Sequence, residues 1–149
     1  MTTTAPRADG RTVALAHYAA RALLERTLAP HGISFLQSVT LRLAVVAEGP
    51  VERAGLIDGA VGAVKIDAAE AERAVGELTA AGLVTPEGPS RVRATDAGRR
   101  LYGTASGESA AIAERLYEGI SEEDRAVAGR VLTLVAQRAD AELAALGQR

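Results

Sequence analysis

The chain has 149 residues, of which 48% are hydrophobic and only 3% aromatic, a size and content that suit one domain with its own core. It contains no cysteine, which excludes disulfides and thiolate metal sites, and its net charge of −2 gives no global basic footprint for nucleic acid. No apolar run approaches the roughly 20 residues that a membrane span needs, so we expect a cytoplasmic protein without a membrane partner.

The first predicted helix runs from about Arg11 to Ala29, and Pro30 and Gly32 end it. Residues at helical spacing form one apolar face: Val13, Ala16, His17, Ala20, Leu23, Leu24, Thr27 and Leu28.

The two histidines of the chain invite different interpretations. His17 lies on the apolar face, next to Tyr18 and one turn before Arg21. It is either a core or interface histidine with one hydrogen bond, which we favour, or a pocket residue that reads or protonates a ligand. His31 is interpreted as a turn residue near solvent. With two histidines, no His-x-x-x-His spacing and no cysteine, the sequence predicts no metal and no cofactor.

A second helix is predicted from Phe35 to about Ala47, with Ser34 as its cap. It is apolar over much of its circumference, which is typical of a helix buried on several sides. Gly49-Pro50 ends this helix. The stretch after it is weakly patterned, and we expect a short helix from Asp58 to Lys65 although each internal glycine costs about 1 kcal/mol relative to alanine.

The stretch from Ile66 to Thr95 predicts a helix followed by a hairpin. Asp67 is the candidate N-cap, and Gly82 can take the left-handed conformation that ends a helix. Two β-prone runs follow, at residues 83–85 and 91–94, separated by the turn-forming residues 86–90. Helix, hairpin and a new helix at Thr95 is the order of a winged helix-turn-helix, so the predicted class is mainly α with a small β-hairpin wing.

Two long helices complete the chain. Thr95 caps a helix from Asp96 to about Glu118, and Gly119 breaks it. Ser121 then begins a capping-box pattern for the last helix, whose apolar face carries Val127, Val131, Leu134, Val135, Leu143 and Leu146. The first helix and these two present more apolar surface than a small winged domain can cover, so we expect a homodimer.

The order and spacing of four motifs resemble the MarR (multiple antibiotic resistance regulator) family of bacterial ligand-responsive repressors. The motifs are Leu28–Ile33, Leu78–Val84, Thr95–Leu101 and Ile120–Asp124. The resemblance implies a single domain over residues 1–149, with dimerisation helices at 11–33 and 96–147 and a winged helix-turn-helix at 34–95. It also implies a triangular homodimer, operator DNA as a partner and a pocket for small molecules, often phenols or aromatic acids.

The resemblance places DNA contacts on Arg73, Arg91 and Arg93, with Glu70 able to accept from cytosine N4. Three features depart from the family. The predicted recognition segment, Asp67 to Val84, holds one arginine and four acidic residues. The wing is short and lacks the Asp-x-Arg signature of the family. Ser38 stands where many members have a tryptophan at the pocket wall.

The resemblance also places ligand contacts on His17, Arg21, Phe35 and Ser38, around a cavity suited to an aromatic or acidic molecule. Two functions fit these residues, and a third, purely structural dimer partner, fits less well. The first is a ligand-responsive transcriptional regulator, which we favour. The second is a relative that has lost DNA binding and serves as a small-molecule binder or an enzyme, with His17, Tyr18 or Arg21 as acid, base or carboxylate clamp.

Overall fold

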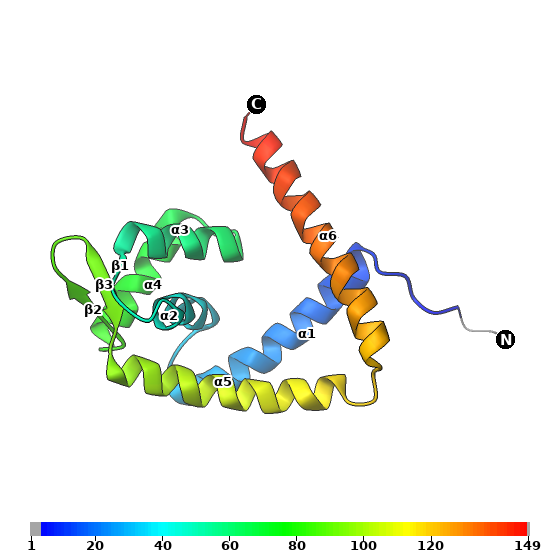
Figure 1. Cartoon of the computed structure of the whole chain (residues 1–149), viewed down its shortest axis with the longest axis horizontal. Helices are drawn as coiled ribbons and strands as arrows, with labels where there is room; N and C mark the ends of the chain where they lie inside the picture. Colours follow the sequence, from blue (N-terminus) through cyan, green and yellow to red (C-terminus); the bar gives the residue numbers. More distant parts are fainter. Residues whose placement is uncertain (1–3, 149) are drawn as a thin grey trace. The chain divides into compact units, whose positions relative to one another are not determined.

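The structure is a computed structural model that describes residues 4–148. Six α-helices and three short strands follow in the described chain: α1 (Gly10–Leu28), α2 (Phe35–Val46), β1 (Val51–Glu52), α3 (Arg53–Val64), α4 (Ala68–Ala80), β2 (Val84–Glu87), β3 (Arg91–Ala94), α5 (Asp96–Tyr117) and α6 (Glu122–Leu146), with a 3-10 turn, η1 (Ala29–His31), after α1 (Figure 1). The predicted class, mainly α with a small wing, is confirmed. The chain forms two compact units that meet within α5, one up to Ala111 and one from Ile112.

The core of the first unit lies where α2, α3 and α4 pack against one another and against the sheet (Figure 1). Its best-buried large side chains include Leu41, Val75, Leu78 and Val84. Alanines supply the remaining contacts: Ala44, Ala60, Ala71 and Ala74 are all at most 2% exposed. Because alanine is small, the three helices can approach closely, which explains how a chain so poor in aromatic residues still closes a core.

The sheet has three antiparallel strands in the order β1-β3-β2. The sequence predicted only the hairpin; β1 was missed because it is two residues long and is defined by its pairing of Val51 with Val92. The strand β2 also extends beyond the predicted 83–85, through Pro86, to Glu87. Proline is tolerated here because β2 is an edge strand, whose outward N–H needs no partner in the ladder.

The third helix begins at Arg53, so the predicted start at Asp58 is wrong by five residues. Its backbone leaves β1 directly, and the Arg53 N–H donates to the Ser90 carbonyl at the wing turn. Leu56 and Ile57 are buried in the core. This packing against distant residues outweighs the low helix propensity of the glycines. The sequence pattern shows the low propensity and cannot show the packing.

Helix α4 has the caps that the sequence predicts. The Asp67 carboxylate accepts from the Glu70 N–H at 2.8 Å, and the Glu70 carboxylate accepts in return from the Asp67 N–H, which completes a capping box. At the other end Gly82 has φ of +74°, a left-handed conformation that glycine adopts without strain. The boundaries of this helix are therefore fixed by local chemistry.

The start of α5 is fastened to the end of the α4 loop. The Thr95 hydroxyl accepts from the Gly98 N–H at 3.0 Å and donates to the Gly82 carbonyl at 2.7 Å, so the predicted cap is confirmed. The Thr95 N–H donates to the Leu83 carbonyl. Gly98 is buried, and a Cβ built on it would lie 2.1 Å from the Leu83 oxygen. Glycine is thus required at this position because α5 passes too close to the Leu83 backbone to leave room for a side chain.

The turn after α1 corrects the interpretation of His31. Its side chain is only 19% exposed, and Nε2 lies 3.2 Å from a carboxylate oxygen of Glu108 on α5. His31 thus lies in the turn, as predicted, but its half-buried side chain bridges this turn to α5 and does not face solvent freely. The sequence could not indicate this contact, because the two residues are 77 positions apart.

The second unit contains the end of α5, the turn at Gly119 (φ +79°) and α6, which Ser121 caps by accepting from the Asp124 N–H. Helix α6 buries no residue within the chain. Its apolar side chains are exposed together with those of the preceding turn: Leu116, Tyr117, Ile120, Val127, Val131, Leu132, Leu134, Val135, Leu143 and Leu146. No helix within residues 4–148 combines the length and hydropathy needed to cross a membrane.

Candidate functional site

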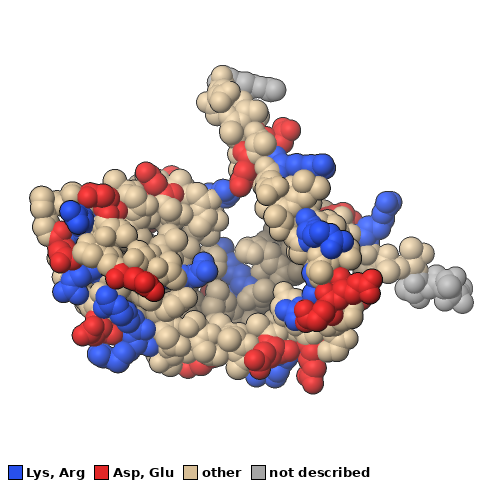
Figure 2. All heavy atoms as spheres, in the orientation of Figure 1, with Lys and Arg blue, Asp and Glu red and all other residues tan. Residues whose placement is uncertain are grey.

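The first candidate site is the surface of α4 and the wing, where the resemblance places the DNA contacts. Basic and acidic side chains are interspersed over the first unit in the face that Figure 2 presents. From Asp67 to Val84 the net charge is −3. Binding to DNA phosphates requires cations, and free acidic side chains repel phosphates. The hydrogen-bond and ion-pair partners of each acidic side chain therefore matter for DNA binding.

Two of the acids on α4 are engaged in local structure. The Glu70 carboxylate turns back to the helix start in the capping box, and Glu77 accepts a hydrogen bond from the Gln37 amide of α2. Arg73 is exposed between them, and all three side chains border a small hollow of about 230 Å³ whose other wall is the start of α2, at Ser34 and Leu36. Arg73 is therefore accessible, and the neighbouring acids Glu72 and Glu77 are also exposed to solvent.

The two wing arginines lie on the middle strand, β3, and each is near a glutamate. Arg91 Nε lies 3.5 Å from Glu52 on β1, and Arg93 Nε lies 3.6 Å from Glu87 on β2. All four side chains are between 43% and 60% exposed. Sequence reasoning named both arginines and missed both glutamates as their partners, because the pairing of β1 was not foreseen and Glu87 was placed in the turn and not on β2.

The second candidate site is the junction of α1 and α2 within the first unit. The Arg21 guanidinium lies over the Phe35 ring, 4.4 Å from its centroid, and its Nε donates to Glu25 at 3.0 Å. A cation on an aromatic face is a stabilising arrangement. The Ser38 hydroxyl, one turn after Phe35, donates to the Phe35 carbonyl at 2.7 Å and is partly buried. The structure thus brings two of the four predicted ligand residues, Arg21 and Phe35, into contact, and Ser38 lies one turn further along α2.

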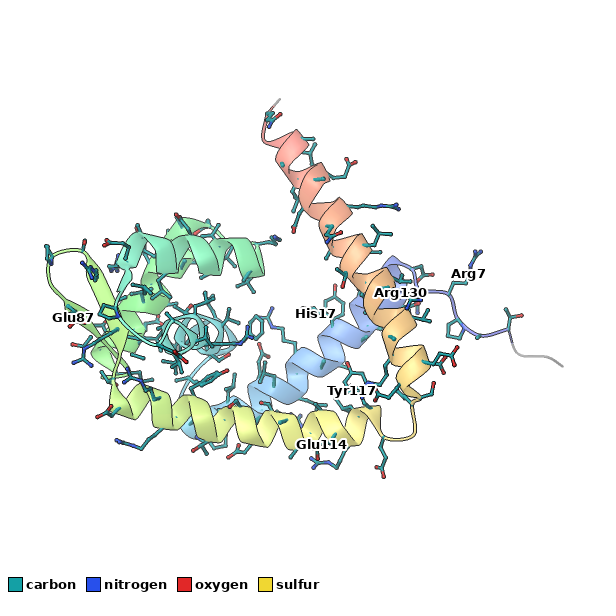
Figure 3. The ribbon with its side chains drawn as sticks, in the orientation of Figure 1. Arg7, His17, Glu87, Glu114, Tyr117 and Arg130 are labelled. Carbon is teal, nitrogen blue, oxygen red and sulfur yellow. The ribbon has the colours of Figure 1, made fainter. Side chains whose placement is uncertain are left out.

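His17 lies further toward the start of α1 (Figure 3). Its ring centroid is 6.0 Å from that of Tyr18. Both are exposed in the single chain, Tyr18 to 65%. An exposed imidazole on an apolar stripe is compatible with either of the two interpretations of His17. Glu25, the partner of Arg21, was not named from the sequence, although its position four residues along the helix is the spacing at which such pairs form.

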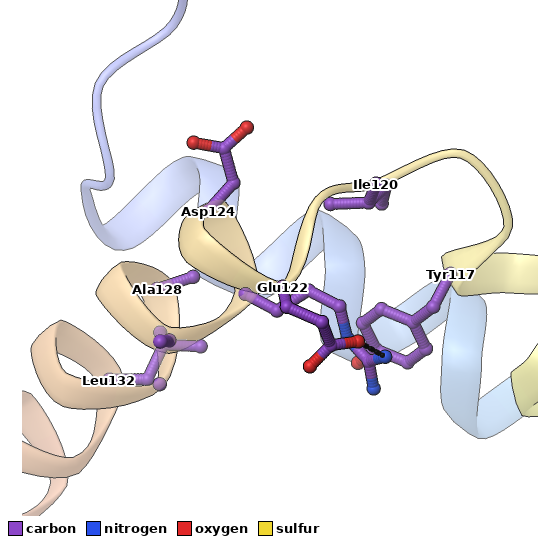
Figure 4. A pocket seen from close by; sticks show the side chains of 9 residues that line it. Tyr117, Ile120, Glu122, Asp124, Ala128 and Leu132 are labelled. Carbon is purple, nitrogen blue, oxygen red and sulfur yellow. Dashed lines mark hydrogen bonds and ion pairs between the residues drawn. The ribbon is translucent and has the colours of Figure 1, made fainter.

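A larger hollow, of about 640 Å³, lies in the second unit at the turn between α5 and α6 (Figure 4). Tyr117, Ile120 and Leu132 give it an apolar lining. Arg125 lies over the Tyr117 ring at 4.5 Å and pairs with Glu122 at 2.9 Å. The hollow is an extension of the exposed apolar face of α6. Among residues 4–148, no three metal-ligating side chains cluster closely enough to hold an ion.

No family sequence model and no curated protein sequence matches the chain. Solved structures do match its fold. CouR from Rhodococcus jostii, determined with p-coumaroyl-CoA bound, superposes with a TM-score of 0.73 at 24% identity, over 90% of this chain and 96% of that one. The reduced form of MarR from E. coli gives 0.69 at 18% identity, over 89% and 95%. A MarR-family regulator from Silicibacter pomeroyi gives 0.63 at 25%, over 80% and 81%.

Helix α3, helix α4 and the β2–β3 wing, followed by a long capped helix, make this chain a winged helix-turn-helix protein. Its fold, including the long helices on either side of the winged region, is that of the MarR-family transcriptional regulators. The resemblance drawn from the four sequence motifs is therefore confirmed.

Proposed function

We propose that the chain is a homodimeric, ligand-responsive transcriptional regulator of MarR type that acts in the cytoplasm. The observation that carries the proposal is the extent of the fold match: CouR aligns over 90% of this chain, so the match takes in long helices as well as the winged region. We retain the division of one domain into dimerisation helices at 11–33 and 96–147 and a winged region at 34–95.

Homodimerisation is supported by apolar exposure. Ten large hydrophobic side chains from Leu116 to Leu146 are exposed in the single chain, as are Leu15 and Tyr18 on α1. Monomeric proteins seldom expose such contiguous apolar area, because burying it against a partner is favourable. Light scattering at micromolar concentration is expected to give twice the chain mass, and a stable folded monomer would contradict the proposal.

DNA binding is proposed through Arg73 on α4 and through Arg91 and Arg93 on the wing. Fluorescence anisotropy with a labelled duplex from upstream of the gene tests it, in low and in physiological salt. Arg91→Ala with Arg93→Ala should weaken binding to every sequence and flatten its salt dependence, since phosphate contacts release counterions. No binding by the folded dimer at low salt would refute DNA binding.

Ligand binding is proposed at the α1–α2 junction. Arg21 over Phe35 offers a cation beside an aromatic face, and Ser38 is a small hydroxyl residue one turn after Phe35 on the same helix. CouR was solved with an aromatic acyl thioester, p-coumaroyl-CoA, and its fold is shared by this chain. The proposed ligand is therefore a small aromatic or acidic molecule.

A second function is favoured by one observation, the acidic character of the α4 surface. Its net charge of −3 and the glutamates beside both wing arginines fit a protein that has kept the pocket and lost DNA binding. In that case the molecule is a small-molecule binder or an enzyme that uses His17, Tyr18 or Arg21. A ligand that shifts the melting temperature of a dimer without DNA affinity would select this function.

A further inference from the structure

The wing places its two arginines between acidic neighbours. The strand β3 is the middle strand, and both Glu52 on β1 and Glu87 on β2 stand opposite Arg91 in the register. Glu87 makes its ion pair diagonally, with Arg93 at 3.6 Å, while Glu52 pairs with Arg91 at 3.5 Å. Glu87 is visible near the wing in Figure 3. The sheet order therefore gives each arginine an acid of its own.

These pairs are loose enough to open. Both distances lie beyond the range of a strong charge-assisted hydrogen bond, about 2.7–2.9 Å, and all four side chains are about half exposed. Exposed pairs of this kind contribute little to stability. Each arginine can thus exchange its carboxylate for another anion. A DNA phosphate is such an anion, and the exchange leaves the carboxylate nearby as an unpaired negative charge.

We propose that Glu52 and Glu87 limit the affinity of the wing for DNA by competing with phosphates for Arg91 and Arg93. The inference rests on the proposed DNA-binding function and names residues that set its strength. Two consequences follow. An arginine that stays paired with its carboxylate neutralises no phosphate and releases no counterion from the DNA, so the salt dependence of binding is shallow. The DNA contacts of α4 then contribute more of the binding free energy than those of the wing.

The test replaces both acids by their isosteric amides, Glu52→Gln with Glu87→Gln, in the full-length dimer. The probe is a fluorescein-labelled mixed-sequence duplex of about 30 base pairs, so no operator has to be known; phosphate contact is sequence-independent. Affinity at low salt should rise about tenfold or more. The slope of log affinity against log salt should steepen by about 0.9 for each arginine that engages a phosphate.

Two controls separate this competition from a general charge effect. Glu114→Gln with Glu118→Gln makes the same change in net charge at exposed positions of the second unit, one on α5 and one directly after it, and should raise affinity far less, because the wing arginines pair with Glu52 and Glu87. Arg91→Ala with Arg93→Ala, added to the wing glutamine variant, should abolish the gain. If the gain survives, the acids act by repelling DNA directly, and the competition is refuted.

The remaining outcomes distinguish the inference from the function beneath it. If the wild type binds DNA and the glutamine variant binds with equal or lower affinity, the inference is overturned and the proposed function stands. The acids then either have no effect on affinity or orient the arginines. Binding by the variant and none by the wild type supports the inference and removes the proposed function. Binding by neither overturns both. Circular dichroism of each variant confirms that the fold is retained.

Discussion

Replacing Gly98 by alanine should destabilise the first unit more than any other single methyl addition to α5. The new Cβ would lie 2.1 Å from the Leu83 carbonyl oxygen and 3.0 Å from its carbon, with a methyl of Leu41 at 3.3 Å. Favourable contact between heavy atoms lies near 3.5–4.0 Å. The obstacle is backbone, and that same oxygen accepts from the Thr95 N–H at 3.0 Å, so it cannot turn aside without losing a hydrogen bond.

The magnitude follows from the kind of clash. Overpacking a core by one methyl typically costs about 1–3 kcal/mol, and an immovable neighbour puts this case at about 3 kcal/mol or above. For a chain of this length that corresponds to a fall in melting temperature of roughly 6–12 °C. Thermal and urea unfolding followed by far-ultraviolet circular dichroism measures it, at equal protein concentrations because dimerisation makes the midpoint concentration-dependent.

The same helix offers a matched control. A Cβ at Gly103 or Gly107 would meet nothing within 4 Å, so alanine there should be neutral or stabilise α5 by up to about 1 kcal/mol through helix propensity. The expected result is a large fall in melting temperature for Gly98→Ala and no fall for the same substitution at Gly103 or Gly107. Equal melting temperatures for Gly98→Ala and Gly103→Ala would refute the close-approach argument.

Three further predictions address the cap, the interface and the pocket. Thr95→Val removes a hydroxyl that accepts from Gly98 and donates to Gly82, and should cost about 1–2 kcal/mol in urea unfolding; an unchanged midpoint would mean that the cap is dispensable. Leu134→Asp places a charge on the exposed apolar face of α6 and should weaken the proposed homodimer, which light scattering over a dilution series would reveal; an unaltered dimer would move the interface elsewhere. Ser38→Trp should abolish the thermal shift given by aromatic acids or phenols while the dimer persists, and a retained shift would place the ligand at another site.

The sequence predicted the features that depend on a few adjacent residues. The caps at Ser34, Asp67, Thr95 and Ser121 are all present, because a side chain that accepts from the first turn is a local property. The left-handed glycine at Gly82 is present for the same reason.

What the sequence could not predict depends on partners far along the chain. The strand β1 exists through its pairing with Val92, and with it the ion pair from Glu52 to Arg91. The contact of His31 with Glu108 is a longer-range case. Helical periodicity shows which residues share a face of α1, and it does not show what covers that face, so the role of His17 stays a prediction.

The core of the first unit extends beyond the winged segment at residues 34–95. Leu28 from the end of α1, Ile33 from the following turn and Ala105 from α5 are buried in the same cluster as the residues of α2, α3 and α4. Excising residues 34–95 would strip this cluster of side chains and leave cavities, each with a cost in stability. The shared core also restricts how a ligand signal could move the wing, because the end of α1, the start of α5 and the winged helices have to move together if the core is to stay filled.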